Sequence, residues 1–182
     1  KWLSFYFGAV FIMLMYNFII YLIIKNRSFL YYVLFHISYI VFALGLTGIA
    51  FELFWPETPQ INLYVLPMSM ALPGAFGVLF AIYYLDMKKM SIRLYKFLYF
   101  LVVVSFLTFL LPFIADYSFA VQVGSLLSFS IAIVLFIIAL YLVFFKKNRN
   151  AVFYLLAWSF FVLGVVVAHL SNIGIIPSTM LT

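Results

Sequence analysis

The first 24 residues, KWLSFYFGAVFIMLMYNFIIYLII (1–24), form an apolar run that ends at the basic segment KNRS (25–28). A helix that crosses a bilayer needs about 20 apolar residues, whereas a signal peptide has an apolar core of only about 7–15 residues. The run therefore predicts a membrane-spanning helix. The whole chain is 69% hydrophobic and 8% charged, and a soluble domain carries about 25% charged residues. We therefore expect lipid to be its main solvent.

Five more apolar segments follow the first. The six predicted spans cover residues 2–24, 29–54, 61–85, 97–114, 119–145 and 151–174. No alternating pattern of barrel strands is visible, so helices are expected to satisfy the backbone polar groups in lipid. The short links between the spans require neighbouring helices to run antiparallel. The predicted fold class is all-α, a polytopic transmembrane helix bundle, with residues 1–182 forming one membrane domain.

The basic residues sort into alternate loops. Nine of the ten Lys and Arg residues lie there: Lys25, Arg27, Lys88, Lys89, Arg93, Lys96, Lys146, Lys147 and Arg149. An excess of Lys and Arg marks the cytoplasmic side of a membrane protein. We therefore expect the N-terminus outside, the three basic loops inside and residues 175–182 outside. This pattern predicts a multi-pass protein of the cell inner membrane.

The segment FELFWPETPQ (51–60) carries two carboxylates beside a Trp-Pro pair. The predicted topology places Glu52 and Glu57, together with Asp116, at the outer surface. Trp55 suits an anchor at the headgroup level, and Pro56 can end a helix. We interpret the segment as a turn at the outer rim. Docking of an outer partner and catalysis by the paired acids are the alternatives.

Few polar residues fall inside the predicted spans, where such residues are functional suspects. Asn17 and His36 both lie roughly 10 Å from the inner boundary. We expect a hydrogen bond between their helices, with a titrating switch at His36 as the alternative. His169 lies about 15 Å farther out than His36, so the two histidines cannot bind one metal or haem iron. His169 is expected to have its hydrogen-bonding groups satisfied near the outer interface, or else to act as a ligand or signal relay.

Small residues recur at helical spacing in two spans. The third span has Ser69, Pro73, Gly77 and Ala81 on one face, and the fifth has Gly124, Ser128 and Ala132. Small faces allow close helix packing in membranes, and proline kinks a helix. We predict tight packing around a kink at Pro73, with a hinge that moves during signalling as the alternative.

Several chemistries lack candidate residues. Cysteine is absent, no lysine lies within a span for a Schiff base, and no phosphate loop, zinc motif or serine elbow occurs. We therefore expect no enzyme activity, no catalytic or metal site and no cofactor. Nucleic acid is not an expected partner, because the cations do not form a stripe on a solvated face.

Two other function classes remain open. A small transporter or channel is the alternative reading, with a wet path past Asn17, His36, Ser69 and Ser128. Against it, every acid lies at a rim rather than at the membrane midplane. A membrane-embedded enzyme would use His169 with Glu52 or Asp116, but these positions lack the spacing of a metal site.

Several blocks resemble a bacterial receptor family, the seven-transmembrane receptors with diverse intracellular signalling modules (7TMR-DISM). The blocks are LMYNFIIYLIIKNRSFLYYVLF (14–35), GLTGIAFELFWPETP (45–59), YYLDMKK (83–89), AWSFFVLG (157–164) and SNIGIIPS (171–178). The matching positions are Tyr16, Asn17, Arg27, Tyr31, Tyr32, Gly48, Trp55, Pro56, Leu85, Asp86, Trp158, Gly164, Asn172, Gly174 and Pro177.

The resemblance implies the membrane domain of a receptor that relays an extracytoplasmic signal to a cytoplasmic module. That module would be a histidine kinase of a two-component system, a diguanylate cyclase or a phosphatase. The family pattern also implies a periplasmic sensor domain before Lys1 and a seventh span after Thr182. We therefore expect this chain to be a fragment with six of seven spans, and homodimerisation stays open.

The candidate signalling or packing residues follow from the intramembrane polar groups and from the matched blocks. They are Asn17, His36, Trp55, Pro56, Pro73, Trp158, His169, Asn172, Gly174 and Pro177. We expect the moving parts at Pro73 and at the two turns Trp55–Pro56 and Asn172–Pro177.

Overall fold

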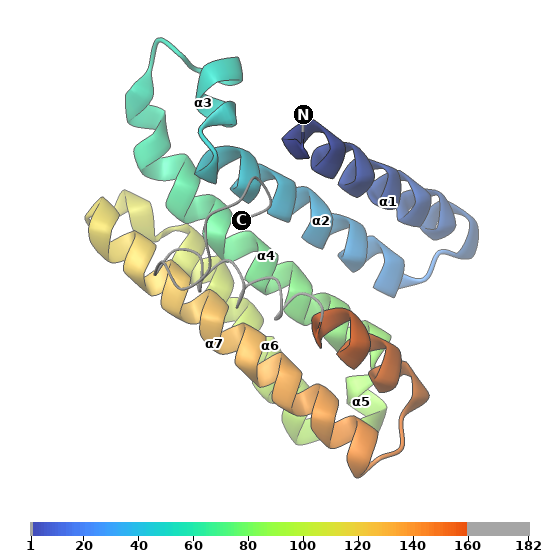
Figure 1. Ribbon diagram of the computed structural model, residues 1–182. Coiled ribbons are helices and arrows are strands. Elements are labelled where there is room, and N and C mark those ends of the chain that lie inside the picture. Colours follow the sequence, from blue (N-terminus) through green and yellow to red (C-terminus); the bar gives the residue numbers. More distant parts are fainter. Residues whose placement is uncertain (1, 160–182) are drawn as a thin grey trace, which may run out of the picture. The chain divides into compact units, whose positions relative to one another are not determined.

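The computed structural model describes residues 2–159, with side chains from Phe7 onward. Over these residues the chain is built from helices and contains no β-strand (Figure 1), which confirms the predicted all-α fold class. The chain divides into two compact units. Residues 10–135 form one unit, and residues 1–9 with the chain from residue 136 form the other.

Five helices in the described part of the chain are long and apolar enough to cross a membrane. They are α1 (Trp2–Ile24), α2 (Arg27–Leu46), α4 (Asn62–Tyr84), α6 (Ile92–Phe109) and α7 (Tyr117–Phe144). They correspond to the first five predicted spans. The sixth predicted span is helical from residue 149 to the end of the described chain, so the total of six spans and the outer N-terminus remain predictions.

The second predicted span, residues 29–54, is not one helix. The helix α2 ends at Leu46, and a separate short helix, α3 (Ile49–Phe54), begins after Gly48. The Gly48 backbone has a φ of 77°, a left-handed conformation in which glycine avoids the steric cost of a side chain. The apolar sequence continues through this break, so hydropathy alone could not locate it.

The fourth predicted span, residues 97–114, also has different bounds. The helix α6 begins at Ile92 because the Ser91 side chain caps it, and the Ser91 hydroxyl accepts the Leu94 N–H at 3.4 Å. Ser is a favoured residue at this position. The first turns of α6 carry Arg93 and Lys96, whose long side chains can extend toward water from an apolar helix.

Short elements connect the long helices. The 3-10 helix η1 (Pro59–Ile61) precedes α4, the four-residue helix α5 (Met87–Met90) joins α4 to α6, and η2 (Leu111–Phe113) follows α6. Asp86, before α5, has a φ of 52°, and Lys25, between α1 and α2, has a φ of 57°. Both connections therefore turn through a left-handed residue within two residues of the end of a long helix.

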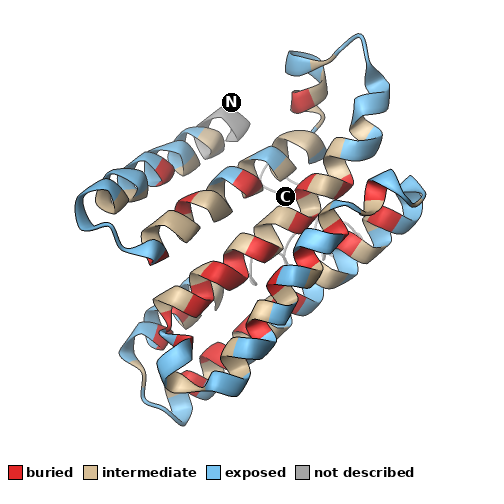
Figure 2. Cartoon of the chain, turned by 180° about the vertical axis from the view of Figure 1, so that it is seen from behind, coloured by how far each residue is buried: buried red, intermediate tan, exposed pale blue. Residues whose placement is uncertain are grey.

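The helix α4 has more buried residues than any other helix of the unit formed by residues 10–135. Its buried residues are Pro67, Ser69, Ala71, Ala75, Gly77, Val78, Leu79, Ala81 and Ile82. Both α2 and α6 pack against it, and Figure 2 shows the buried positions following one another along its length. The packing of this unit therefore centres on α4.

Candidate signalling site

Two prolines interrupt the backbone hydrogen bonding of α4. Pro67 and Pro73 lie inside this helix, and each removes the N–H that would bond the carbonyl four residues earlier. Such positions are a known cause of helix kinks. Pro67 is buried and Pro73 is half-buried. The turn between them is therefore the part of α4 with the fewest backbone constraints of its own.

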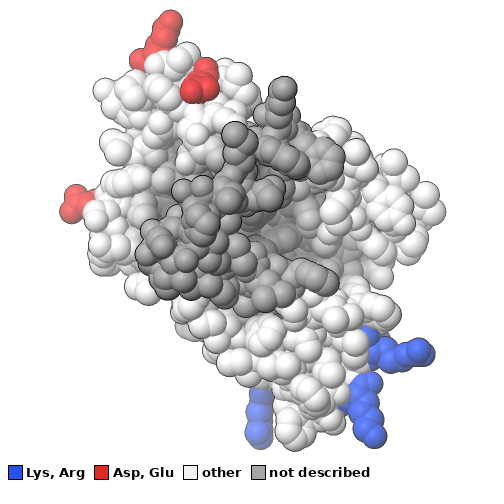
Figure 3. Space-filling view, viewed as in Figure 1, with Lys and Arg blue, Asp and Glu red and all other residues white. Residues whose placement is uncertain are grey.

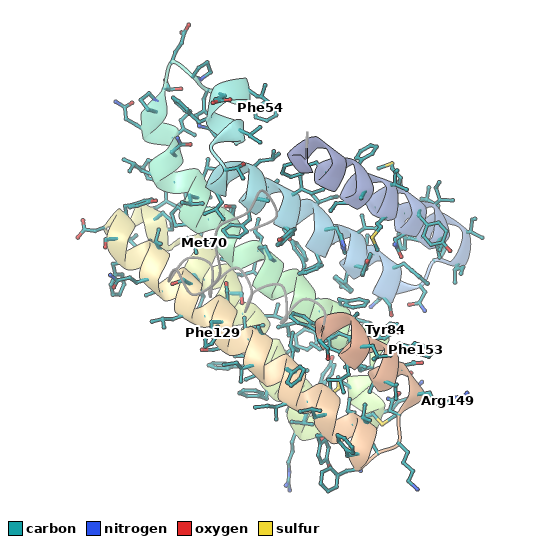
Figure 4. All side chains as sticks on the ribbon, viewed as in Figure 1. Phe54, Met70, Tyr84, Phe129, Arg149 and Phe153 are labelled. Carbon is teal, nitrogen blue, oxygen red and sulfur yellow. The ribbon has the colours of Figure 1, made fainter. Side chains whose placement is uncertain are left out.

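Side-chain hydroxyls supply hydrogen bonds to the same segment of α4. The Ser69 hydroxyl donates to the Leu66 carbonyl at 2.8 Å. The Ser128 hydroxyl of α7 donates to the Met70 carbonyl at 3.2 Å, and Figure 4 labels Met70 on α4. A hydroxyl that bonds a helix carbonyl often accompanies bending. The bond from Ser128 ties α7 to α4 one turn before Pro73.

Glycines allow α2 to approach α4 closely. A Cβ atom added to Gly45 of α2 would lie 3.8 Å from the Ser69 hydroxyl oxygen and from Leu66 Cδ1. A Cβ atom added to Gly77 of α4 would lie 3.4 Å from the Phe35 ring. The small face of α4 that the sequence indicated is therefore in contact with α2, since small residues permit short distances between helices.

Glycines also line the contacts of α4 with α6 and α7. A Cβ atom added to Gly74 would lie 3.2 Å from Ile131 Cδ1 and 3.6 Å from the Ser105 hydroxyl oxygen. A Cβ atom added to Gly124 of α7 would lie 3.6 Å from Met70 Cβ. Gly74 directly follows Pro73, so the weakest part of the α4 backbone lies where three neighbouring helices meet it.

The turn between α3 and α4, here called the Trp55 turn (residues 55–62), is held by one side-chain bond. The indole Nε1–H of Trp55 donates to Asn62 Oδ1 at 2.9 Å. Trp55 is half-buried and Pro56 is exposed. Asn62 is the first residue of α4, so this bond connects the end of α3 to the start of α4. Sequence reasoning selected Trp55 but missed Asn62, because nothing in the sequence marks the partner.

The carboxylates do not belong to any group of three potential metal ligands within the described residues. Glu52, Glu57 and Asp116 are all exposed, and no cluster of three potential ligands occurs in the described chain. On the face shown in Figure 3, acidic and basic side chains do not intermingle. Glu52 and Glu57 are therefore at the surface of the described chain, and their place at the outer membrane rim stays a prediction.

Asp86 forms the single ion pair found among the described residues. Its carboxylate lies 3.3 Å from Lys89 Nζ, and the two side chains are 57% and 80% exposed. Exposed pairs of this kind contribute little to stability. The pair is a local one, three residues apart in the sequence.

The expected hydrogen bond between Asn17 and His36 is not formed. Asn17 Nδ2 donates to the Met13 carbonyl at 2.8 Å, and His36 Nδ1 lies 3.0 Å from the Tyr32 carbonyl. Each side chain therefore bonds the residue four positions earlier in its own helix. A carbonyl in the same helix is always within reach, whereas a bond between helices also needs both side chains to face each other.

The remaining candidates lie toward the end of the chain. Trp158 contacts the buried Tyr154, with ring centroids 5.7 Å apart. His169, Asn172, Gly174 and Pro177 lie outside the described residues. Their expected roles therefore stay predictions.

The long apolar helices define a polytopic membrane protein in which α2 and α6 pack on a proline-containing helix. A sequence model of the family described as "7TM diverse intracellular signalling" matches residues 1–182, the whole chain. The chain belongs to this family, which confirms the resemblance found in its sequence blocks. No curated protein and no solved structure matches the chain.

Proposed function

We propose that this chain is the membrane domain of a bacterial receptor that relays an extracytoplasmic signal to a cytoplasmic output module. The family description, which names intracellular signalling, supports this assignment. The structural observation that carries it is α4, which has more buried residues than any other described helix and contains two prolines. A rigid packing helix with a weak point is suited to exist in two packed arrangements.

The proposed relay begins at the Trp55 turn. The bond from Trp55 to Asn62 links this turn to the first residue of α4, and α4 ends close to the basic segment 86–96. A sensor domain that binds the turn differently in two states would shift the balance between two packings of α4. Pro73 would absorb the change, because its backbone lacks a helix hydrogen bond.

The wider setting follows from the same proposal. The basic loops would face the cytoplasm of a bacterial cell, and the domain would lie in the inner membrane as a multi-pass protein. A periplasmic sensor would precede it, and a kinase, cyclase or phosphatase module would follow a seventh span. The domain itself would transmit the signal without catalysing a reaction.

The experiment that tests the relay is substitution of Pro73 in the full receptor. Pro73→Ala should restore a backbone bond in α4 and change the basal activity of the output module by about fivefold or more, the lower range of allosteric coupling. The output is measured in cells that contain equal amounts of receptor in the membrane. Ile12→Ala, in the exposed part of α1, is the control. Unchanged output in both Pro73→Ala and Trp55→Phe would contradict a relay through α4.

A further inference from the structure

Arg27, the first residue of α2, lies over a group of tyrosine rings that joins three helices. Its Cζ atom is 5.9 Å from the centroid of the Tyr83 ring in α4. Tyr31 of α2 stacks on Tyr83 with centroids 4.9 Å apart. The Tyr83 hydroxyl oxygen lies 3.4 Å from that of Tyr99 in α6. These four residues are called the Arg27 cluster.

The cations around the Arg27 cluster have little negative charge to balance them. The segments 25–28 and 86–96 contain six cations, all exposed: Lys25, Arg27, Lys88, Lys89, Arg93 and Lys96. The single carboxylate in these segments is Asp86, and Lys89 lies 3.3 Å from it. Arg27 therefore has a tyrosine ring beside it but no carboxylate among its described neighbours, so an anion from outside the chain can supply its counter-charge.

The surroundings of the cluster favour a lipid as the source of that charge. The three tyrosine rings are half-buried, and tyrosine is enriched at the level of the lipid headgroups. Large exposed apolar side chains flank the same segments: Ile23, Ile24, Ile92, Phe97 and Phe100. Acyl chains can cover such side chains, whereas a water-soluble anion cannot. Guanidinium groups bind phosphate oxygens through two parallel hydrogen bonds.

We propose that the Arg27 cluster is a binding site for the headgroup phosphate of an anionic phospholipid. Arg27 donates to the phosphate oxygens, and the rings of Tyr31 and Tyr83 hold the guanidinium at headgroup depth. Because α2, α4 and α6 all contribute to the cluster, a bound lipid would fasten the ends of these helices to one another. This site depends on the membrane placement of the chain but not on the proposed relay.

The test measures the association of spin-labelled lipids with the full chain in phosphatidylcholine nanodiscs. Spin-labelled phosphatidylglycerol should associate more strongly than spin-labelled phosphatidylcholine. Arg27→Gln should reduce this preference by about fivefold, which corresponds to about 1 kcal/mol for one cation near the surface. Equal association of the two lipids with the unmodified chain would overturn the proposal.

Lys88→Gln is the matched control, since it removes one exposed cation from a neighbouring segment outside the cluster. This variant should retain most of the preference for phosphatidylglycerol over phosphatidylcholine. If Lys88→Gln reduces the preference as much as Arg27→Gln does, the effect comes from net charge and no site exists at Arg27. Soluble glycerol 3-phosphate is added in a second arm. Displacement of the labelled lipid by this compound would show that phosphate suffices without acyl chains, and would overturn the lipid assignment.

Two further variants keep the test decisive if Arg27→Gln does not fold. Arg27→Lys retains the charge but not the paired hydrogen bonds of a guanidinium, so it should lose part of the preference. Tyr83→Leu removes the ring under Arg27 and should also reduce it. Helical content and a single elution peak establish folding. A full preference for phosphatidylglycerol in both folded variants would contradict the proposed site.

Discussion

The helices α1 and α4 have the same length, 23 residues, and both are apolar enough to cross a membrane, yet they differ in burial. Leu14 is the single buried residue in the described side chains of α1, whereas α4 has nine buried residues. The α1 sequence is rich in large side chains such as Phe11, Ile12 and Met13, all more than half exposed. The α4 sequence contains Gly, Ala, Ser and Pro at its contacts. Apolarity thus decides which segments enter lipid, and side-chain size decides which of them pack.

The largest effect is expected from adding bulk to each helix. Gly74→Leu should lower the free energy of unfolding by about 3 kcal/mol, since a Cβ atom alone would already lie 3.2 Å from Ile131. Gly8→Leu in α1 has nothing within 4 Å of the new Cβ atom and should change stability by less than about 1 kcal/mol. Steric trapping in bicelles measures both values. Similar losses for the two variants would contradict the comparison.

Truncation of a large side chain should give a smaller difference in stability between the two regions than the addition of bulk does. Leu85, the residue directly after α4, is fully buried, and Ile23 of α1 is 75% exposed. Leu85→Ala should cost about 2 kcal/mol, the low end for a core truncation, because lipid is as apolar as leucine and mainly packing is lost. Ile23→Ala should cost close to nothing. An equal cost for both would mean that α1 is packed as tightly as α4.

Loss of the bond at the start of α4 should have a smaller effect. Trp55→Phe keeps an aromatic ring but removes the Nε1–H that bonds Asn62, so it should lower stability by about 1 kcal/mol. A double-mutant cycle with Asn62→Ala isolates the bond from the change in ring size. Additive effects of the two substitutions would show that the bond does not hold the Trp55 turn.

The smallest effect is expected at the hydroxyl that joins α7 to α4. Ser128→Ala removes the bond to the Met70 carbonyl and should cost about 0.6 kcal/mol, the average for such bonds in a membrane protein. Ser125→Ala is the matched control, because the Ser125 hydroxyl bonds the Gln122 carbonyl of its own helix. If Ser125→Ala lowers stability as much as Ser128→Ala does, the effect comes from helix propensity and not from the bond between α7 and α4.

The sequence predicted the all-α class and the approximate positions of five long helices because the apolar runs and the charged loops between them can be read directly along the chain. It did not predict the helix break at Gly48, since Thr47 and Gly48 are a short interruption in an otherwise apolar segment. The predicted bond between Asn17 and His36 was wrong for a related reason. Equal depth in the membrane says nothing about rotation around the helix axis, and each side chain bonds its own helix instead.

The sequence also did not predict which residues of different helices contact one another. Gly77 was selected by its spacing, but Gly74 has the shorter contact and belongs to no repeat. Trp55 was recognised as an interfacial residue. Its partner Asn62 was not, because the two side chains meet only when the turn reverses the direction of the chain. The rings around Arg27 come from three helices. Such groups require the packing itself, which composition does not determine.

The left-handed backbone at Gly48 also fixes the thickness of bilayer to which this part of the chain is matched. With 20 residues, α2 has a length of about 30 Å, close to the hydrocarbon thickness of an average membrane. Without the break, a continuous helix through Phe54 would extend the rod by about 12 Å. A longer rod would have to tilt or locally thicken its bilayer. The helix break at Gly48 thus prevents a hydrophobic mismatch that a continuous apolar helix through α2 and α3 would create.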